Sequence, residues 1–298
     1  TRRVFMGGNV TPGTTNVIDF VTTASAGDAT DFGDLTASVY QDSAGASNSK
    51  SAIVFGYQNN TINTINIATT GNATDFGDTL TSTFYQIMGA DNGGGGLPQE
   101  GAFPQRASVN YMPGSGRGLV QGVGVPFNTN VDLIHIPTAG NSSDFGDTTS
   151  ARNYAAGASS LTRGIAGGGS DPSAVNIIDV TEMASRGTYS DFGDTSVTRA
   201  RSAGNVCSPT RALFSGGDTP TKSDVIDYIT MASVGNATDF GNLTVARTDA
   251  AGGLSSSVRG VVGGGATSST TESNIMDYVT IASTGDSTDF GDLSAGRT

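Results

Sequence analysis

The chain has 298 residues, a formal net charge of −12 and a sequence pI of about 4.3. This acidic balance disfavours a phosphate-binding surface, so nucleic acid is not expected as a partner. The single cysteine excludes a framework of intrachain disulfides, and no segment resembles a signal peptide or a membrane span, so membrane insertion is not expected.

Six copies of one acidic tetrapeptide organise the sequence. Each reads Asp-Phe-Gly-Asp, with Asn at the last position of one copy, and they occupy residues 31–34, 75–78, 144–147, 191–194, 239–242 and 289–292. Successive copies begin 44, 69, 47, 48 and 50 residues apart. Such a period is typical of propeller blades. Because repeat units bury their apolar faces against their neighbours, we expect one domain over residues 1–298.

Four strand-like segments follow one another in each unit, most clearly in residues 247–292. The first, at 249–254, contains small residues, as the crowded axis of a propeller requires. The second, at 259–262, runs into three glycines, the third, at 275–282, alternates apolar and polar side chains, and the fourth, at 289–293, contains the tetrapeptide. Short β-branched segments between Gly, Asn, Asp and Ser clusters are typical of strands. The sequence therefore predicts an all-β fold, a six-bladed β-propeller with four-stranded antiparallel blades.

The pattern of the unit resembles the kelch repeat. Kelch units also have a basic residue before the first strand, a diglycine at the end of the second, and aromatic residues in the third and fourth. The diglycine is present here at Gly7-Gly8, Gly168-Gly169, Gly216-Gly217 and Gly264-Gly265, and two units depart from it, at Phe55-Gly56 and Gly122-Val123. The usual kelch Trp is absent, and the tetrapeptide Phe takes its place. The resemblance implies a divergent, kelch-like propeller.

Two further resemblances concern the amino-acid sequence around the tetrapeptide. Phrases such as Thr-Asp-Phe-Gly-Asp-Leu-Thr are similar to repeat proteins encoded by marine bacteriophages, including cyanophages, which implies a virion-associated protein. Residues 142–148, Ser-Ser-Asp-Phe-Gly-Asp-Thr, resemble the Asp-box of sialidase-type propellers. In that family the box is a turn motif remote from catalysis, so this match implies a structural role.

Charged residues recur in register at three positions of the unit. One basic set precedes the second strand (Arg2, Lys50, Arg117, Arg163, Arg211 and Arg259), and another precedes the first strand (Arg106, Arg152, Arg201, Arg247 and Arg297). The third strand carries Asp19, Asn63, Asp132, Asp179, Asp227 and Asp277. We expect ion pairs within or between blades. The alternative is a ring of cations at the channel mouth that binds an anionic sugar or phosphate.

The tetrapeptide carboxylates are expected in a tight turn, in which Asp accepts backbone N–H groups, Gly supplies a positive φ and Phe packs between blades. The alternative is calcium, for which the spacing of three indicates Asp28, Asp31, Asp34, Asp286, Asp289 and Asp292. No copy matches an EF-hand loop, and no other cofactor is expected. Glycoside hydrolysis needs one special carboxylate pair, and six equivalent copies argue against it.

Other catalytic chemistry lacks the residues it needs. His135 is the only histidine and takes a strand position that Thr holds in other units, so it is expected to face outward. Cys207 lies in a first strand among small residues and is expected to be a buried filler. The sequence therefore predicts a non-enzymatic protein.

The units differ most in two places. The loops after the second strand vary, at residues 9–15, 57–61, 124–130, 170–174, 218–224 and 266–273, and an insertion at about 81–105 lengthens the step of 69. In a propeller, second-to-third loops and blade-to-blade connections emerge on one face, so both are expected on one rim. Candidate binding residues on that rim are Tyr57, Tyr85, Asp91, Asn92, Phe103, Asp171, Asp218 and Lys222.

A constant scaffold with a variable rim is typical of a recognition module. Together with the phage resemblance, it predicts a fibre or tail component of a virion that binds a host surface glycan or protein. Two alternatives stay open: a structural protein that packs through its loops against other virion subunits, and a carbohydrate-active enzyme that uses Asp91 with Asp218 or Asp224.

The assembly state and the ends of the chain are also left open. A homo-oligomer and a seventh blade outside residues 1–298 are both compatible with the sequence. The chain starts with Thr1 rather than Met, which indicates a processed product or part of a longer polypeptide. The short spacing from Arg297 round to Arg2 places both ends within the innermost strand of the first blade.

Overall fold

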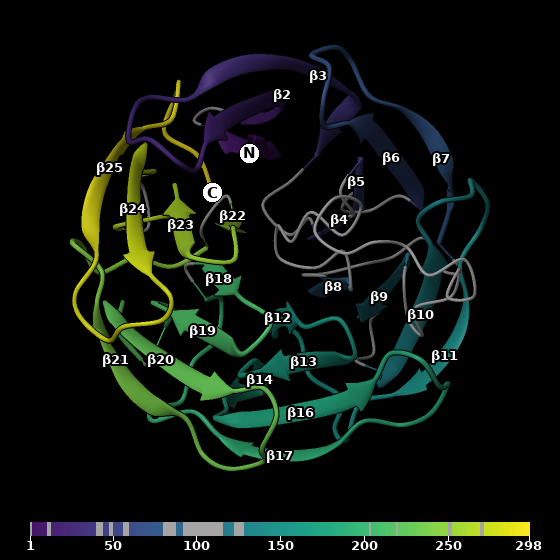
Figure 1. The fold of residues 1–298 in the computed structure, drawn as a ribbon, viewed down its shortest axis with the longest axis vertical. Coiled ribbons are helices and arrows are strands. Elements are labelled where there is room, and N and C mark those ends of the chain that lie inside the picture. The colour runs from purple at the N-terminus through teal and green to yellow at the C-terminus, as the bar shows by residue number, and fades with distance from the viewer. Residues whose placement is uncertain are drawn as a thin grey trace, which may run out of the picture.

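The computed structural model describes residues 2–10, 13–39, 44–47, 50–55, 60–79, 88–91, 116–121, 128–202, 204–218, 220–249, 252–268 and 271–298. These residues form strands and no helix, so no helix among them could cross a membrane. Six small antiparallel sheets are arranged around an axis as the blades of a propeller (Figure 1). The predicted all-β, six-bladed fold is confirmed.

Five blades have four strands each, which follow the chain from the axis outward. Blade 2 comprises β4 (Ala44–Ser47), β5 (Ser51–Phe55), β6 (Thr61–Asn66) and β7 (Thr74–Asp78). Blade 3 comprises β8 (Met88–Asp91), β9 (Arg117–Gln121), β10 (Asn130–His135) and β11 (Ser143–Asp147). Blade 4 comprises β12 (Ala156–Ser159), β13 (Arg163–Gly167), β16 (Ile177–Glu182) and β17 (Ser190–Asp194), with the short hairpin β14 (Ser170–Asp171) and β15 (Ser173–Ala174) between β13 and β16.

Blade 5 comprises β18 (Gly204–Cys207), β19 (Arg211–Ser215), β20 (Val225–Thr230) and β21 (Thr238–Asn242). Blade 6 comprises β22 (Gly252–Ser255), β23 (Arg259–Gly263), β24 (Ile275–Thr280) and β25 (Thr288–Asp292). Blade 1 has three strands among the described residues, β1 (Arg2–Val10), β2 (Gly13–Thr22) and β3 (Thr30–Val39).

Blade 6 joins blade 1 directly, so the ring closes with six blades. Asn9 and Thr298 exchange two backbone hydrogen bonds, of 2.7 and 3.2 Å. At the outer edge, the amide of Gly27 donates to the carbonyl of Phe290 at 2.9 Å. Closure of the ring by segments from both ends of the chain protects sheet edges that an open array would expose.

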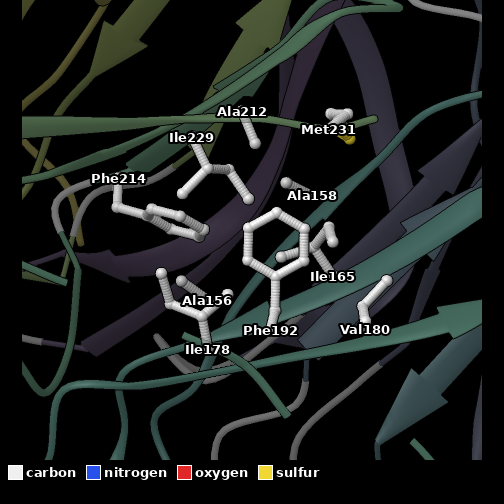
Figure 2. Close-up of a cluster of buried hydrophobic side chains, with 10 residues drawn as sticks. All are labelled: Ala156, Ala158, Ile165, Ile178, Val180, Phe192, Ala212, Phe214, Ile229 and Met231. Carbon is white, nitrogen blue, oxygen red and sulfur yellow. The ribbon is translucent and has the colours of Figure 1, made fainter. Parts of the chain in front are cut away.

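Apolar side chains from adjacent blades fill the spaces between them. Between blades 4 and 5, Phe192 of the tetrapeptide lies in the middle of the cluster, beside Ile165 of its own blade and Ile229 of the next (Figure 2). The six tetrapeptide phenylalanines are 2–7% exposed. The predicted packing of this residue between blades is confirmed.

The tetrapeptide forms a β-bulge in the outermost strand, and the predicted tight turn is wrong. In blade 4, Ile178 pairs with Gly193 and Asp179 pairs with Asp191, so that Phe192 is the extra residue. The same shift occurs in every blade. A bulge twists the strand and re-aims one side chain, here the phenylalanine that enters the core.

Each bulge also forms one outer joint with the following blade. The carbonyl of its Phe accepts the amide of a glycine in the next blade, at 2.7–3.1 Å in all six copies. The tetrapeptide glycine has φ values between +138° and +150°, as predicted, and a Cβ on Gly193 would lie 2.6 Å from the carbonyl of Gly235. The repeated Gly is therefore required by backbone contact between blades.

The second and third copies of the tetrapeptide are 69 residues apart, and the extra residues of this interval do not lie where the sequence predicts them. Residues 92–116 separate β8 from β9, the first and second strands of blade 3, whereas Ser159 and Arg163 bound the same loop in blade 4. Because successive strands are antiparallel, this loop and the second-to-third loops emerge at opposite faces. The prediction that both sources of variation share one rim is wrong, although residues 92–115 themselves lie outside the described residues.

Candidate functional site

The predicted ion pairs are confirmed in four blades, and they are buried. Arg152 binds Asp179 at 2.8 Å, Arg199 binds Asp227 at 2.5 Å, Arg247 binds Asp277 at 2.9 Å, and Arg297 binds Asp19. All eight side chains are 0–2% exposed. These charges are part of the core and are closed to a ligand.

One residue of this set was assigned incorrectly from the sequence. The buried arginine of blade 5 is Arg199, eight residues after the first Asp of its tetrapeptide, as are Arg152 and Arg247. Arg201 was expected to fill this role, but it lies two residues further along the chain. Arg106 lies outside the described residues.

The arginines that begin the second strands link adjacent blades. Arg163 donates to the carbonyl of Met231 at 2.7 Å, Arg211 to that of Ile281 at 3.0 Å, and Arg259 to that of Thr23 at 3.1 Å. Arg2 and Arg117 make equivalent bonds. These arginines therefore hold the blades together, and the alternative of a ring of ligand-binding cations finds no support in them.

One face of the propeller, which we call the hairpin face, carries three short backbone pairings after the second strands. They join Ser170 to Ala174, Asp218 to Lys222, and Ala266 to Glu272. Each also pairs with the segment that leads into the innermost strand of its blade, at Asn153, Ala200 and Thr248 respectively. The innermost strands β12, β18 and β22 lie next to the axis, along one part of it (Figure 1), so these segments bring side chains to the axial side of the hairpin face.

Tyr154, Arg201 and Asp249 occupy the same position in three successive blades, directly after those paired residues. Their φ values are +59°, +54° and +50°, and they are the three non-glycine residues with positive φ among the described residues. Left-handed backbone disfavours side chains with a Cβ and is found disproportionately at functional sites. The chain places a phenol, a guanidinium and a carboxyl where glycine would be less strained.

The three side chains form a chain of contacts across blades 4, 5 and 6. Arg201 donates from Nη2 to the Tyr154 hydroxyl at 2.7 Å, and its guanidinium lies 4.4 Å from the centre of the tyrosine ring. On its other side, Nη1 of Arg201 lies 3.8 Å from a carboxylate oxygen of Asp249. The backbone supports this order, because the amide of Asp249 donates to the carbonyl of Arg201 at 3.0 Å.

The electrostatics of this cluster separate it from the buried ion pairs. The pKa of Asp249 is raised to about 6, chiefly by burial and to a smaller extent by Asp218, against the opposing effects of Arg201, Lys222 and a hydrogen bond from Thr248. Burial alone lowers the pKa of Arg201, but Asp249 and Tyr154 outweigh it, and the net shift is upward. Shifted carboxyls on a partly exposed surface are frequent at binding sites.

This arrangement can bind a polar ligand. It offers a partly exposed guanidinium, a phenol, and a carboxyl that changes charge near neutral pH. The described residues contain no group of three or more His, Cys, Asp or Glu side chains that could hold a metal ion.

The structure brings two of the sequence-predicted residues to this cluster and places others elsewhere. Asp218 and Lys222 belong to the blade 5 hairpin and act on Asp249 electrostatically. Asp171 is exposed in the blade 4 hairpin. Asp91 ends β8 at the opposite face, which separates its backbone from that of Asp218 and argues against the carboxylate pair considered for an enzyme. Outside the described residues lie Tyr57, Tyr85, Asn92 and Phe103.

Two of the calcium candidates take part in the outer joints. The Asp28 carboxylate accepts the amide of Asp292 at 3.2 Å, and the Asp286 carboxylate accepts the amide of Asn242 at 2.9 Å. Asn72 and Asn236 fill the same position in other joints, which shows that it needs an acceptor oxygen and no charge. Asp31 and Asp289 are exposed on the outermost strands, and Asp34 is partly exposed. Among the described residues, no group of acidic side chains there could hold a metal ion.

The residues that sequence reasoning missed share a signal that the repeat contains. Tyr154, Arg201 and Asp249 each lie ten residues after the first Asp of a tetrapeptide, two residues after a buried arginine. Position eight is constant in these units, whereas position ten changes from unit to unit. A variable position beside a constant one could have identified the cluster.

Neither protein-family models nor curated proteins match this chain. The kelch and phage resemblances therefore stay predictions, and the fold and the geometry of the cluster carry the functional argument.

Replacement of Asp249 by asparagine is expected to raise the free energy of unfolding at pH 7 by about 1–3 kcal/mol. The folded protein holds the Asp249 proton up to about pH 6, whereas the ordinary pKa is 3.8. Native stability therefore falls as pH rises through this window, and asparagine removes this loss. Urea unfolding of both proteins at pH 4 and pH 7 measures it. Equal pH dependence in the two proteins would contradict the assignment.

Proposed function

We propose that this protein is a non-enzymatic recognition module that binds a surface glycan through its hairpin face. The observation that carries the proposal is the Tyr154–Arg201–Asp249 cluster. It breaks the symmetry of the blades, it keeps side chains on strained backbone, and it lies beside loops that differ between blades. Functional residues concentrate on variable loops held by a rigid scaffold.

The polarity of the hairpin face favours a glycan over a protein. The exposed large hydrophobic residues among those described are Val234, Val245 and Val258. Val234 and Val258 lie in loops of the opposite face, between β20 and β21 and between β22 and β23, whereas Val245, which is less exposed than either, lies in the connection from β21 to β22 on the hairpin face. Protein partners are usually bound through apolar and aromatic anchors, whereas hydroxyl-rich ligands need polar partners.

A place in a virion, as a fibre or tail component that attaches to a host, is part of this proposal. The similarity of the repeat sequence to repeat proteins of marine phages supports this part of the proposal. A binding scaffold with a net charge of −12 is compatible with a role in a virion. Propellers carry many unrelated functions, so the fold alone does not decide between attachment and assembly.

A glycan array and a whole-cell binding screen test the proposal. Selective binding by the native protein is expected to fall about tenfold or more in Arg201→Ala, because a hydrogen bond from a charged group is lost. Arg186→Ala is the matched control, since Arg186 is exposed in a loop of the opposite face and also donates to a hydroxyl, that of Ser143 at 3.1 Å. The control is expected to bind as the native protein does. No binding by folded native protein, or equal losses in both variants, would contradict the proposal.

A further inference from the structure

Arg201 uses few of its hydrogen-bond donors. Within the described residues its side chain makes one hydrogen bond, to the Tyr154 hydroxyl, and its distance of 3.8 Å to Asp249 is too long for a second. Arg199, by contrast, donates to three carbonyl groups and to Asp227. Since a guanidinium has five N–H donors, Arg201 has several left for a ligand.

The guanidinium of Arg201 is also held in place. The Tyr154 ring lies against it and the Tyr154 hydroxyl accepts a hydrogen bond from it, while the side chain is 36% exposed. A planar guanidinium with an open edge matches a carboxylate, which accepts two parallel hydrogen bonds. An ordered side chain loses less entropy on binding than a free one.

Asp249 is the carboxylate that pairs with Arg201 in the free protein. Its carboxylate lies 3.8 Å from Arg201 and also has a hydrogen bond from Thr248, and the charged groups that act on it are Arg201, Asp218 and Lys222. The two cations and two carboxylates balance in the free protein. Protonation of Asp249 would leave Arg201 and Lys222 in excess over Asp218, and a ligand carboxylate could then replace it.

We propose that the Arg201 guanidinium binds a carboxylate of an acidic sugar polymer, in the place that Asp249 takes in the free protein. This inference rests on the proposed function, which concerns glycan binding in general, and it adds the chemical class of the ligand. The hydroxyl-bearing residues of the surrounding hairpins favour a sugar over an acidic peptide, namely Ser170, Ser173, Thr221, Thr267, Ser268 and Thr271.

Binding to matched acidic and esterified polymers tests the inference. The probes are polygalacturonate, alginate, hyaluronate and polysialate, each with its methyl ester, and polyglutamate as the acidic peptide. We expect at least one acidic polymer to bind about tenfold or more tightly than its ester, and this preference to disappear in Arg201→Ala. Arg201→Lys keeps the charge without the fork and is expected to bind more weakly than the native protein.

The pH dependence gives a second readout. Native binding is expected to tighten from pH 7 to pH 5, while the ligand carboxylate stays ionised. Asp249→Asn removes the competing charge and keeps a residue tolerated at positive φ, so it is expected to bind more tightly at pH 7 and to lose the pH dependence. Unfolding curves confirm that each variant is folded, and Arg186→Ala is again the control.

The outcomes separate this inference from the proposed function. Equal binding of acids and esters, or polyglutamate binding as tight as that of the sugars, overturns the acidic-sugar assignment. So does a failure of all the acidic polymers to bind. If neutral glycans bind in the array and Arg201→Ala weakens them, the proposed function stands while the carboxylate inference falls. If the folded native protein binds no glycan at all, neutral or acidic, both the proposed function and the carboxylate inference are overturned.

Discussion

Replacement of Arg199 by valine is expected to lower the free energy of unfolding by about 3–5 kcal/mol. The Asp227 carboxylate is fully buried, and its other partners are the amide and hydroxyl of Ser196. Without the guanidinium at 2.5 Å, a negative charge would stay in the core without a counter-charge. The variant also loses the donors to three backbone carbonyls. Urea unfolding of the native protein and the variant measures the difference.

Blade 2 supplies the control for this prediction. Buried Val39 and Asn63 stand where blade 5 has Arg199 and Asp227, and Asn63 accepts the amide of Thr36 at 3.1 Å much as Asp227 accepts that of Ser196. The double variant Arg199→Val/Asp227→Asn therefore reproduces a neutral pair that the same fold already contains. We expect it to recover more than half of the stability lost in the single variant. A double variant as unstable as the single one would show that the loss comes from packing and not from charge.

The comparison of these positions shows how the repeat divides structure from function. Arginine at position eight after the first Asp of the tetrapeptide is buried and paired, and it orders the segment that leads into the next innermost strand. Two residues later, the same segment emerges at the hairpin face with a different side chain in each blade. The constant residue thus sets the backbone on which the variable residue is presented.

Much of the fold could be predicted from the sequence, because the repeat constrains it strongly. The period of the tetrapeptide, the alternation of residues 275–282 and the small residues of the first strand all follow from blade geometry. The tetrapeptide was predicted as a turn because Asp and Gly are typical turn residues. Its bulge contacts the next blade, where the carbonyl of Phe192 accepts the amide of Gly235, and such a contact lies beyond any local pattern.

Less of the candidate site could be predicted. Asp218 and Lys222 were identified because their loop varies, but the cluster itself depends on neighbouring blades bringing Tyr154, Arg201 and Asp249 together over distances of almost 50 residues along the chain. The insertion was placed in the wrong loop because sequence spacing gives its length but not the position of β8. The second error concerns where strands begin, which short glycine-rich segments define poorly.

At the outer joints, adding a single methyl group by a Gly-to-Ala substitution tests the contact between blades. Gly193→Ala is expected to destabilise the protein by two effects, positive φ at +145° and a Cβ 2.6 Å from the carbonyl of Gly235. The backbone strain alone is expected to cost about 1–3 kcal/mol. The clash adds about 1–3 kcal/mol, because its partner is backbone that is fixed by the hydrogen bond from Gly235 to Phe192 at 2.8 Å.

Gly235→Ala separates these two effects within the same joint. Gly235 has a φ of +150°, close to that of Gly193, but a Cβ there would meet no atom within 4 Å. It should therefore show the strain without the clash. We expect Gly193→Ala to unfold at a clearly lower urea concentration than Gly235→Ala, with both below the native protein.

The joint recurs six times, and Gly27 and Phe290 form the copy that closes the ring. Gly291→Ala should behave as Gly193→Ala does, because its Cβ would lie 2.8 Å from the backbone of Gly27. Equal stability of Gly193→Ala and Gly235→Ala would show that the blades can separate at this seam without cost, and that the repeated glycine serves the local bulge alone.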